Sequence, residues 1–162
     1  MNFIRPSAIF ATLLALPGVA FAADDTFTVT AEVIDACDIT ANDLDFGNYS
    51  SISGSAADAT TTIDVTCTNG TSYGVSLSTG TTAGGSYSER LLTDSSNTLG
   101  YNLYTSGALT SVWGDGTSST STVTGTGNGS LQSLTVYGEI PASQNVPVGS
   151  YSDTVTATIS IF

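Results

Sequence analysis

The sequence has no histidine, no lysine and only two arginines among its 162 residues. It therefore lacks the commonest general bases, the amine of most Schiff-base chemistry and the commonest metal ligand. The two arginines stand against 14 acidic residues, which gives a formal net charge of −12. Such a chain cannot build the basic patch that neutralises phosphates, so nucleic acids and anionic membranes are poor partners. The composition argues against most enzyme classes, and we expect no catalytic residue, no bound metal and no cofactor.

No apolar run approaches the roughly 20 residues that a membrane-spanning helix needs. The most apolar stretch is shorter, and it lies between Arg5 and the helix-breaking Pro17-Gly18. Ala20-Phe21-Ala22 then has the A-x-A form of a cleavage site. We interpret residues 1–22 as a secretory signal peptide, with a membrane anchor as the alternative. The mature chain then has about 140 residues, enough for one domain, and Arg90 is its only cation.

Cysteine is scarce, and both cysteines, Cys37 and Cys67, lie in the exported part of the chain. In an oxidising compartment two cysteines allow a single pairing. A bridge that closes about 30 residues would contribute roughly 3 to 4 kcal/mol by restricting the unfolded chain. The alternative is a pair of buried thiols, whereas zinc is excluded because no histidine or further cysteine is available.

Helical periodicity is also missing: no amphipathic stripe exceeds two turns, and the ordered-looking segments alternate with period 2. Residues 60–68 and 73–77 alternate in this way, and Asn69-Gly70 between them predicts a β-hairpin with a type I′ turn. The clearest strand is predicted at residues 150–160, where apolar residues occupy the odd positions except at Asp153. We expect further strands at residues 37–41, 44–46, 90–92, 99–105 and 131–140.

The spacing of these segments favours an all-β fold. About seven short strands, with turn signals roughly every ten residues, are typical of an immunoglobulin-like β-sandwich. Residues 114–130 are rich in Gly, Ser and Thr, which predicts a long polar surface connection that contributes little to the core.

Residues 24–35 alternate apolar and polar side chains, but no turn joins them to the strand expected at residues 37–41. This segment is either the first strand of the sandwich or an extension that pairs with the sheet of another copy, since an extended segment can complete an exposed sheet edge. The printed sequence ends at Ile161-Phe162 inside a strongly alternating strand, and we expect no later strand of this chain to cover the edge of that strand. The apolar residues of the segment are Phe27, Val29, Ala31 and Val33.

Seven short blocks occur in an order that is specific as a set. They are CDI at 37–39, LDFGNY at 44–49, VTC at 65–67, LGYNLY at 99–104, WGDG at 113–116, VYGEIP at 136–141 and VPVGSYSD at 146–153. With these blocks the sequence resembles the spore coat protein U domain family, which includes the major pilus subunits of archaic (Csu-type) chaperone–usher systems. Classical pilins usually carry Tyr just before the last residue, whereas this chain has Ile161, which favours the archaic branch.

The resemblance implies an incomplete immunoglobulin-like sandwich that lacks its final strand, with residues 23–36 as a donor-strand extension and residues 37–162 as the pilin domain. The donor strand would be about residues 26–34, although Ile34 breaks the alternation and leaves the register open there. The acceptor groove would be walled by the C-terminal strand. Its implied residues are Val155, Ala157, Ile159 and Ile161.

The implied function is a structural subunit of a surface pilus that polymerises head-to-tail by donor-strand exchange and supports attachment and biofilm formation. The implied partners are identical subunits, a periplasmic chaperone, an outer-membrane usher, and tip or adaptor subunits. The subunit would pass through the periplasm to the cell surface. Without a fibre, the same domain would serve as a spore-coat or surface-layer protein.

Two further sites have a functional and a structural interpretation. Asp43 and Asp45 could be paired carboxylates of a glycosidase or a calcium site, but we expect turn and strand-edge residues. Trp113 could be the sugar-stacking platform of a monomeric carbohydrate-binding module, but we expect it to pack on the sandwich.

Overall fold

The structure, a computed structural model, describes residue 18 and residues 21–162. The predicted signal peptide, residues 1–22, therefore lies almost entirely outside the described residues. The chain divides into two units, one up to Glu32 and a compact one at Val33–Phe162. Within the described residues, no helix has the length and apolar character needed to cross a membrane.

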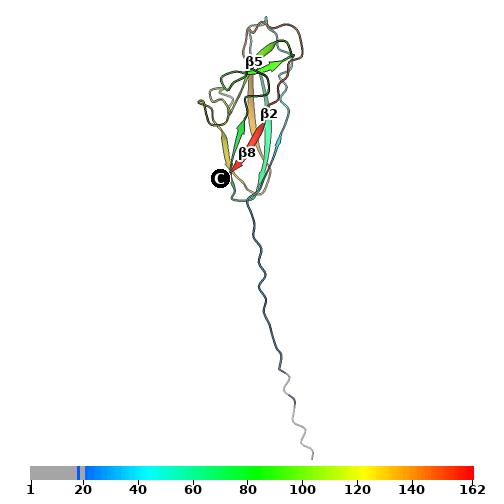
Figure 1. Cartoon of the computed structure of the whole chain (residues 1–162), viewed down its shortest axis with the longest axis vertical. Helices are drawn as coiled ribbons and strands as arrows, with labels where there is room; N and C mark the ends of the chain where they lie inside the picture. The colour runs from blue at the N-terminus through cyan, green and yellow to red at the C-terminus, as the bar shows by residue number, and fades with distance from the viewer. Residues whose placement is uncertain (1–17, 19–20) are drawn as a thin grey trace, which may run out of the picture. The chain divides into compact units, whose positions relative to one another are not determined.

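The compact unit is built from two antiparallel sheets (Figure 1). The first has five strands in the order β1-β2-β7-β5-β4, and the second has three in the order β6-β3-β8. Their bounds are β1 Cys37–Ala41, β2 Ala57–Cys67, β3 Ser72–Leu77, β4 Arg90–Thr93, β5 Thr98–Tyr104, β6 Val123–Thr126, β7 Gln132–Ile140 and β8 Ala157–Ile161. The all-β prediction is confirmed.

Both sheets contribute to one hydrophobic core. Val65 of β2 and Val75 of β3 are fully buried in it, and so is Trp113 from the segment between β5 and β6. The indole Nε1 of Trp113 donates a hydrogen bond to the carbonyl of Val75 over 2.9 Å, which satisfies its polar atom inside the core. The predicted packing of Trp113 on the sandwich is confirmed, and a buried indole has no face to offer a sugar.

The predicted hairpin at Asn69-Gly70 is wrong. β2 pairs with β1 and β7, while β3 pairs with β6 and β8, so this turn carries the chain from one sheet to the other. The Thr71 N–H donates to the Thr68 carbonyl over 3.0 Å, and Gly70 has a φ of +92°. Since Asn69 is not among the positive-φ residues, the turn matches type II rather than type I′.

Three other segment predictions need correction. Residues 44–46 are not a strand, although Leu44 and Phe46 do pack against the core. Only the final part of residues 150–160 forms a strand, β8, preceded by an isolated bridge from Ser152 to Thr93. Residues 114–130 include β6, which pairs with β3, so this stretch is more than a surface connection.

Candidate functional site

An open groove of about 1130 Å³ lies in the compact unit between residues 41–52 and residues 146–157. Its lining includes apolar core side chains from both sheets. These are Ile63, Leu77, Leu99, Tyr101, Leu103, Val136 and Ile140. The hydrophobic core is thus reached directly from the groove, and an apolar side chain entering it would extend the core.

The two walls of the groove are irregular segments held by side-chain hydrogen bonds. The Tyr49 hydroxyl donates to the Pro141 carbonyl over 3.0 Å and accepts from the Gln144 N–H over 2.9 Å. The Gln144 side-chain amide exchanges two hydrogen bonds of 2.7 Å with the backbone of Gly100 in β5. Gln144 therefore substitutes for a strand neighbour at Gly100.

Gly138 of β7 makes room for one wall. A Cβ atom at this position would lie 2.7 Å from Leu44 Cδ2 and 2.8 Å from Phe46 Cζ. Both side chains therefore lie against the backbone of β7, and Phe46 also makes an edge contact with the Tyr101 ring at a centroid distance of 6.1 Å. This packing explains why residues 44–46 are apolar at alternate positions without forming a strand.

β8, drawn in red and ending at the marked C-terminus in Figure 1, has one unpaired edge within the described residues. It pairs with β3 on its other side, with Ile161 opposite Tyr73. Of the four implied acceptor residues, Val155 and Ala157 line the groove. Ile159 packs against the core instead, and Ile161 is 44% exposed.

Asp153, the one polar residue among the inward-facing odd positions, ties the groove wall to a neighbouring loop. Its carboxylate accepts hydrogen bonds from the backbone N–H groups of Thr81 and Thr82, at 2.9 and 3.0 Å, and from the Tyr101 hydroxyl at 2.7 Å. Burial raises the pKa of Asp153, but the hydrogen bonds from Tyr101, Thr81 and Thr82 outweigh it and lower the pKa below its ordinary value. The break in the alternation was the sequence signal for this role.

Arg90 is buried, which sequence reasoning missed. Its guanidinium donates to the Ser78 carbonyl at 2.9 Å, to Asn102 Oδ1 at 2.6 Å and to the Trp113 carbonyl at 2.7 Å. Burial lowers the pKa of the Arg90 guanidinium. Over residue 18 and residues 21–162, then, no lysine or arginine side chain is exposed, and the charged surface is entirely acidic.

The N-terminal segment, residues 24–33, contains no strand in the described structure. Its large apolar side chains are exposed: Phe27 by 87%, Val29 by 80% and Val33 by 83%. Ala31 is exposed as well. Four exposed apolar side chains at alternate positions are unusual, because moving each of them out of water lowers the free energy. The segment therefore has the pattern of a strand but lacks a sheet to join.

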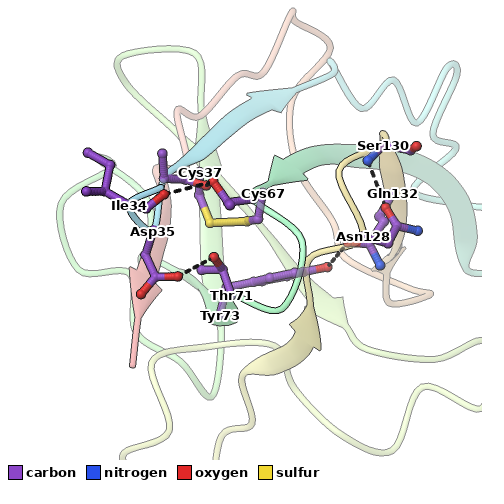
Figure 2. Close-up of a disulfide and its surroundings, with 11 residues drawn as sticks. Ile34, Asp35, Cys37, Cys67, Thr71, Tyr73, Asn128, Ser130 and Gln132 are labelled. Atoms are coloured by element: carbon purple, nitrogen blue, oxygen red, sulfur yellow. Dashed lines mark hydrogen bonds between the residues drawn. A yellow bond between two sulfur atoms is a disulfide. The ribbon is translucent and has the colours of Figure 1, made fainter. Parts of the chain in front are cut away.

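A disulfide joins Cys37 to Cys67 as predicted (Figure 2). The preceding residues are fastened beside it. The Thr68 hydroxyl donates to the Ile34 carbonyl over 3.2 Å, and the Thr71 hydroxyl donates to Asp35 Oδ1 over 2.6 Å.

Asp43 and Asp45 do not form a metal site with other ligands. Among the described residues, no group of three or more His, Cys, Asp or Glu side chains is placed to hold a metal ion. Asp45 Oδ1 accepts a hydrogen bond of 2.7 Å from the Gly47 N–H, and Gly47 has a φ of +65°. This geometry matches the predicted turn role.

Residues 23–158 match the family described as the Spore Coat Protein U domain. The chain belongs to this family. The match confirms the resemblance inferred from the sequence blocks and covers both the N-terminal segment and most of the compact unit. No curated protein is significantly similar to this Spore Coat Protein U domain chain.

Two solved structures share the fold of this Spore Coat Protein U domain. The first is the CsuC–CsuE chaperone–tip adhesion subunit pre-assembly complex from archaic chaperone-usher Csu pili of Acinetobacter baumannii, with 23% identity and a TM-score of 0.58. The match covers 78% of this chain but spans only 40% of that chain. The second is a chaperone-usher pilus studied for rod uncoiling, with 17% identity, a TM-score of 0.54 and coverage of 90% and 99%. These likenesses confirm the immunoglobulin-like fold.

Proposed function

We propose that this chain is a structural subunit of a surface pilus, in which the N-terminal segment of one copy fills the groove of the next. The observation that carries the proposal is that a single chain has both parts of the joint. It has an open groove, lined in part by apolar core side chains, beside an unpaired edge of β8, and it has an exposed segment with alternating apolar side chains. An extended segment that enters the groove satisfies both at once.

In this joint, Phe27, Val29, Ala31 and Val33 are the donor residues and point into the groove. Val155 and Ala157 form part of its wall, and Ile159 and Ile161 continue the acceptor strand along β8. The backbone of the inserted segment pairs with the free edge of β8, which converts exposed N–H and C=O groups into ladder hydrogen bonds.

The joint does not close on itself. Donor and acceptor are different surfaces of one subunit, so each added copy leaves a new groove or segment free, and the assembly grows as a filament. The acidic, Ser- and Thr-rich surface keeps such a filament soluble. As an exposed shaft, it supports surface attachment and biofilm formation.

The subunit is exported through the periplasm to the cell surface. Before assembly its groove leaves the edge of the core without a covering strand, so a periplasmic chaperone covers the groove and an outer-membrane usher exchanges it for the next subunit's segment. Identical subunits are the main partners, with tip or adaptor subunits at the ends. The archaic Csu complex and the chaperone-usher rod, which share the fold, support this assignment.

A second candidate is a spore-coat or surface-layer protein that uses the same domain without a long fibre. The family name supports it. Electron microscopy of material sheared from the cell surface separates the two, because only a pilin gives thin filaments that contain this chain.

The test replaces one donor residue and compares it with its neighbour. Val29→Asp places a charge on the groove-facing side and blocks polymerisation, while Thr28→Asp places the same charge on the opposite side and leaves it intact. Both changes lie outside the compact unit, so the yield of chaperone-bound subunit stays the same. Filaments of normal length from Val29→Asp would overturn the proposal.

A further inference from the structure

The short stretch between the N-terminal segment and β1 is fastened to the domain at every residue. We call residues 34–36 the root. The Ile34 carbonyl accepts a hydrogen bond from the Thr68 hydroxyl at 3.2 Å, and the Ala36 carbonyl accepts one from the Thr68 N–H at 2.9 Å. Between them, Asp35 Oδ1 accepts from the Thr71 hydroxyl at 2.6 Å (Figure 2). All three partners belong to the turn at residues 68–71.

This turn is itself part of the rigid domain. Thr71 is only 2% exposed, and its carbonyl accepts a hydrogen bond of 2.8 Å from the Gly127 N–H. A Cβ atom on Gly127 would lie 2.4 Å from the Thr68 carbonyl oxygen, so the two backbones are in close contact. The disulfide from Cys67 to Cys37 closes the same corner. The root is therefore attached to a fixed support.

The distance from the root to the groove determines whether the N-terminal segment can reach the groove of its own chain. The groove's lining begins at Ala41, where β1 ends. To enter its own groove, the N-terminal segment would have to run back alongside β1, which makes the root the loop of a β-hairpin. The ten residues 24–33 reach roughly 33 Å when extended, whereas the five residues of β1 span roughly 17 Å. The segment is thus long enough to reach its own groove, so its length does not keep it out.

The fastened root does not have the geometry of a hairpin loop. Hairpin loops of two or three residues need at least one residue with positive φ, usually Gly or Asn. None of Ile34, Asp35 and Ala36 has a positive φ, and none is Gly or Asn. Ile34 is β-branched, so a positive φ is especially unfavourable there. A reversal of the chain would have to break the contacts to Thr68 and Thr71 and also strain the backbone.

We propose that the root is a lock against self-complementation, which keeps the N-terminal segment out of its own groove and reserves it for a second copy of this chain. The lock rests on the proposed function, because it regulates the same groove.

The test unlocks the root in the full exported chain. One variant combines Ile34→Asn, Asp35→Gly and Thr71→Val, which removes the Thr71 contact and supplies an Asn-Gly hairpin loop. The matched control combines Asp35→Asn with Thr71→Ser, which retains both an acceptor and a hydroxyl donor. Size-exclusion chromatography with light scattering measures the monomer fraction, and thermal melting measures the stability of the monomer.

We expect the unlocked variant to raise the monomer fraction about five-fold or more over wild type, at the expense of polymer and independently of protein concentration. The monomer of the unlocked variant should melt at a higher temperature than the wild-type monomer. Adding Val29→Asp should remove this increase in melting temperature. The control should behave as wild type. An unchanged ratio of monomer to polymer in a folded unlocked variant would overturn the lock.

A single substitution tests the lock in case the triple variant does not fold. Thr71→Val alone removes the hydroxyl that holds Asp35, and it should shift the monomer fraction in the same direction relative to Thr71→Ser; equal fractions in the two would also overturn the lock. The failures are distinguishable. If Val29→Asp blocks polymerisation but unlocking changes nothing, only the lock is wrong, whereas polymers that survive Val29→Asp refute the proposed function and the lock together.

Discussion

Filling the groove from the same chain should stabilise the domain strongly, and the size of the expected gain depends on the exposed donor residues. The comparison uses two forms: residues 33–162 alone, and the same residues followed by a flexible linker and a copy of residues 24–33. The first form keeps the root and the disulfide but has no donor. The second presents the donor beside β8 at the C-terminal end, so that it can enter the groove without a reversal at the root.

Phe27, Val29 and Val33 are 87%, 80% and 83% exposed in the free chain. Burying each side chain contributes roughly 1.5 to 3 kcal/mol, or about 5 to 9 kcal/mol together. Ladder hydrogen bonds at about 1 kcal/mol each partly offset the roughly 1 to 2 kcal/mol per residue that ordering the backbone costs. The net gain is therefore smaller than the burial contribution, and we expect the melting temperature to rise by at least about 5 °C.

Differential scanning calorimetry at several protein concentrations measures the gain, and light scattering confirms that the second form is monomeric. Val29→Asp in the appended copy should remove most of the gain, while Thr28→Asp should leave most of it. If residues 33–162 alone are soluble and melt at the same temperature as the extended form, the sandwich is complete without a donor and the reasoning fails.

Two further predictions concern the support of the groove wall. Gly80→Ala should lower the unfolding free energy by about 2 to 4 kcal/mol in urea titrations, because the new Cβ would lie 1.9 Å from Asp153 Oδ2 at a φ of +92°. The control, Gly84→Ala, has a similar φ of +89°, but its new Cβ would lie 3.6 Å from the nearest atom, so it should lower the unfolding free energy clearly less. Equal losses in the two variants would contradict the proposed clash with Asp153. Because hydrogen bonding lowers the folded pKa of Asp153 below its ordinary value of 3.8, its ionised form stabilises the fold above that value, and this stability is lost as the pH falls through the folded pKa. The stability difference between wild type and Asp153→Asn should therefore shrink below about pH 4, and a difference that stays constant with pH would refute the role of the charge.

The sequence predicted which side chains are buried better than which backbones are paired. Along residues 150–160 the odd positions are the more buried ones, as the alternation indicated, yet only β8 forms a ladder. The reason is that alternation reports a buried face, whereas a strand also needs a neighbour at that point. β3 spans only Ser72–Leu77 and can pair no further than Ala157. Leu44 and Phe46 are also partly buried at alternate positions without forming a strand, since they pack on Gly138 and have no partner strand.

Contacts between distant segments could not be predicted from local patterns. Asn69-Gly70 correctly indicated a tight turn, but the partners of the flanking strands come from β1, β6, β7 and β8, which a short-range signal cannot show. The sequence identified Arg90 only as the one cation of the mature chain. Its burial depends on acceptors at Ser78, Asn102 and Trp113 that only the folded chain brings together.

The features of this chain limit which molecule can complete its fold. An open groove with an unpaired strand edge promotes nonspecific association, but an exclusively acidic surface over the described residues makes copies repel one another at random encounter. The root, with Asp35 held by the buried Thr71, keeps the chain's own segment from relaxing into the groove. The free energy of completing the core is therefore not released within the isolated subunit. It remains for the joint with the next copy, where burial of the donor side chains in the completed core stabilises the connection between subunits.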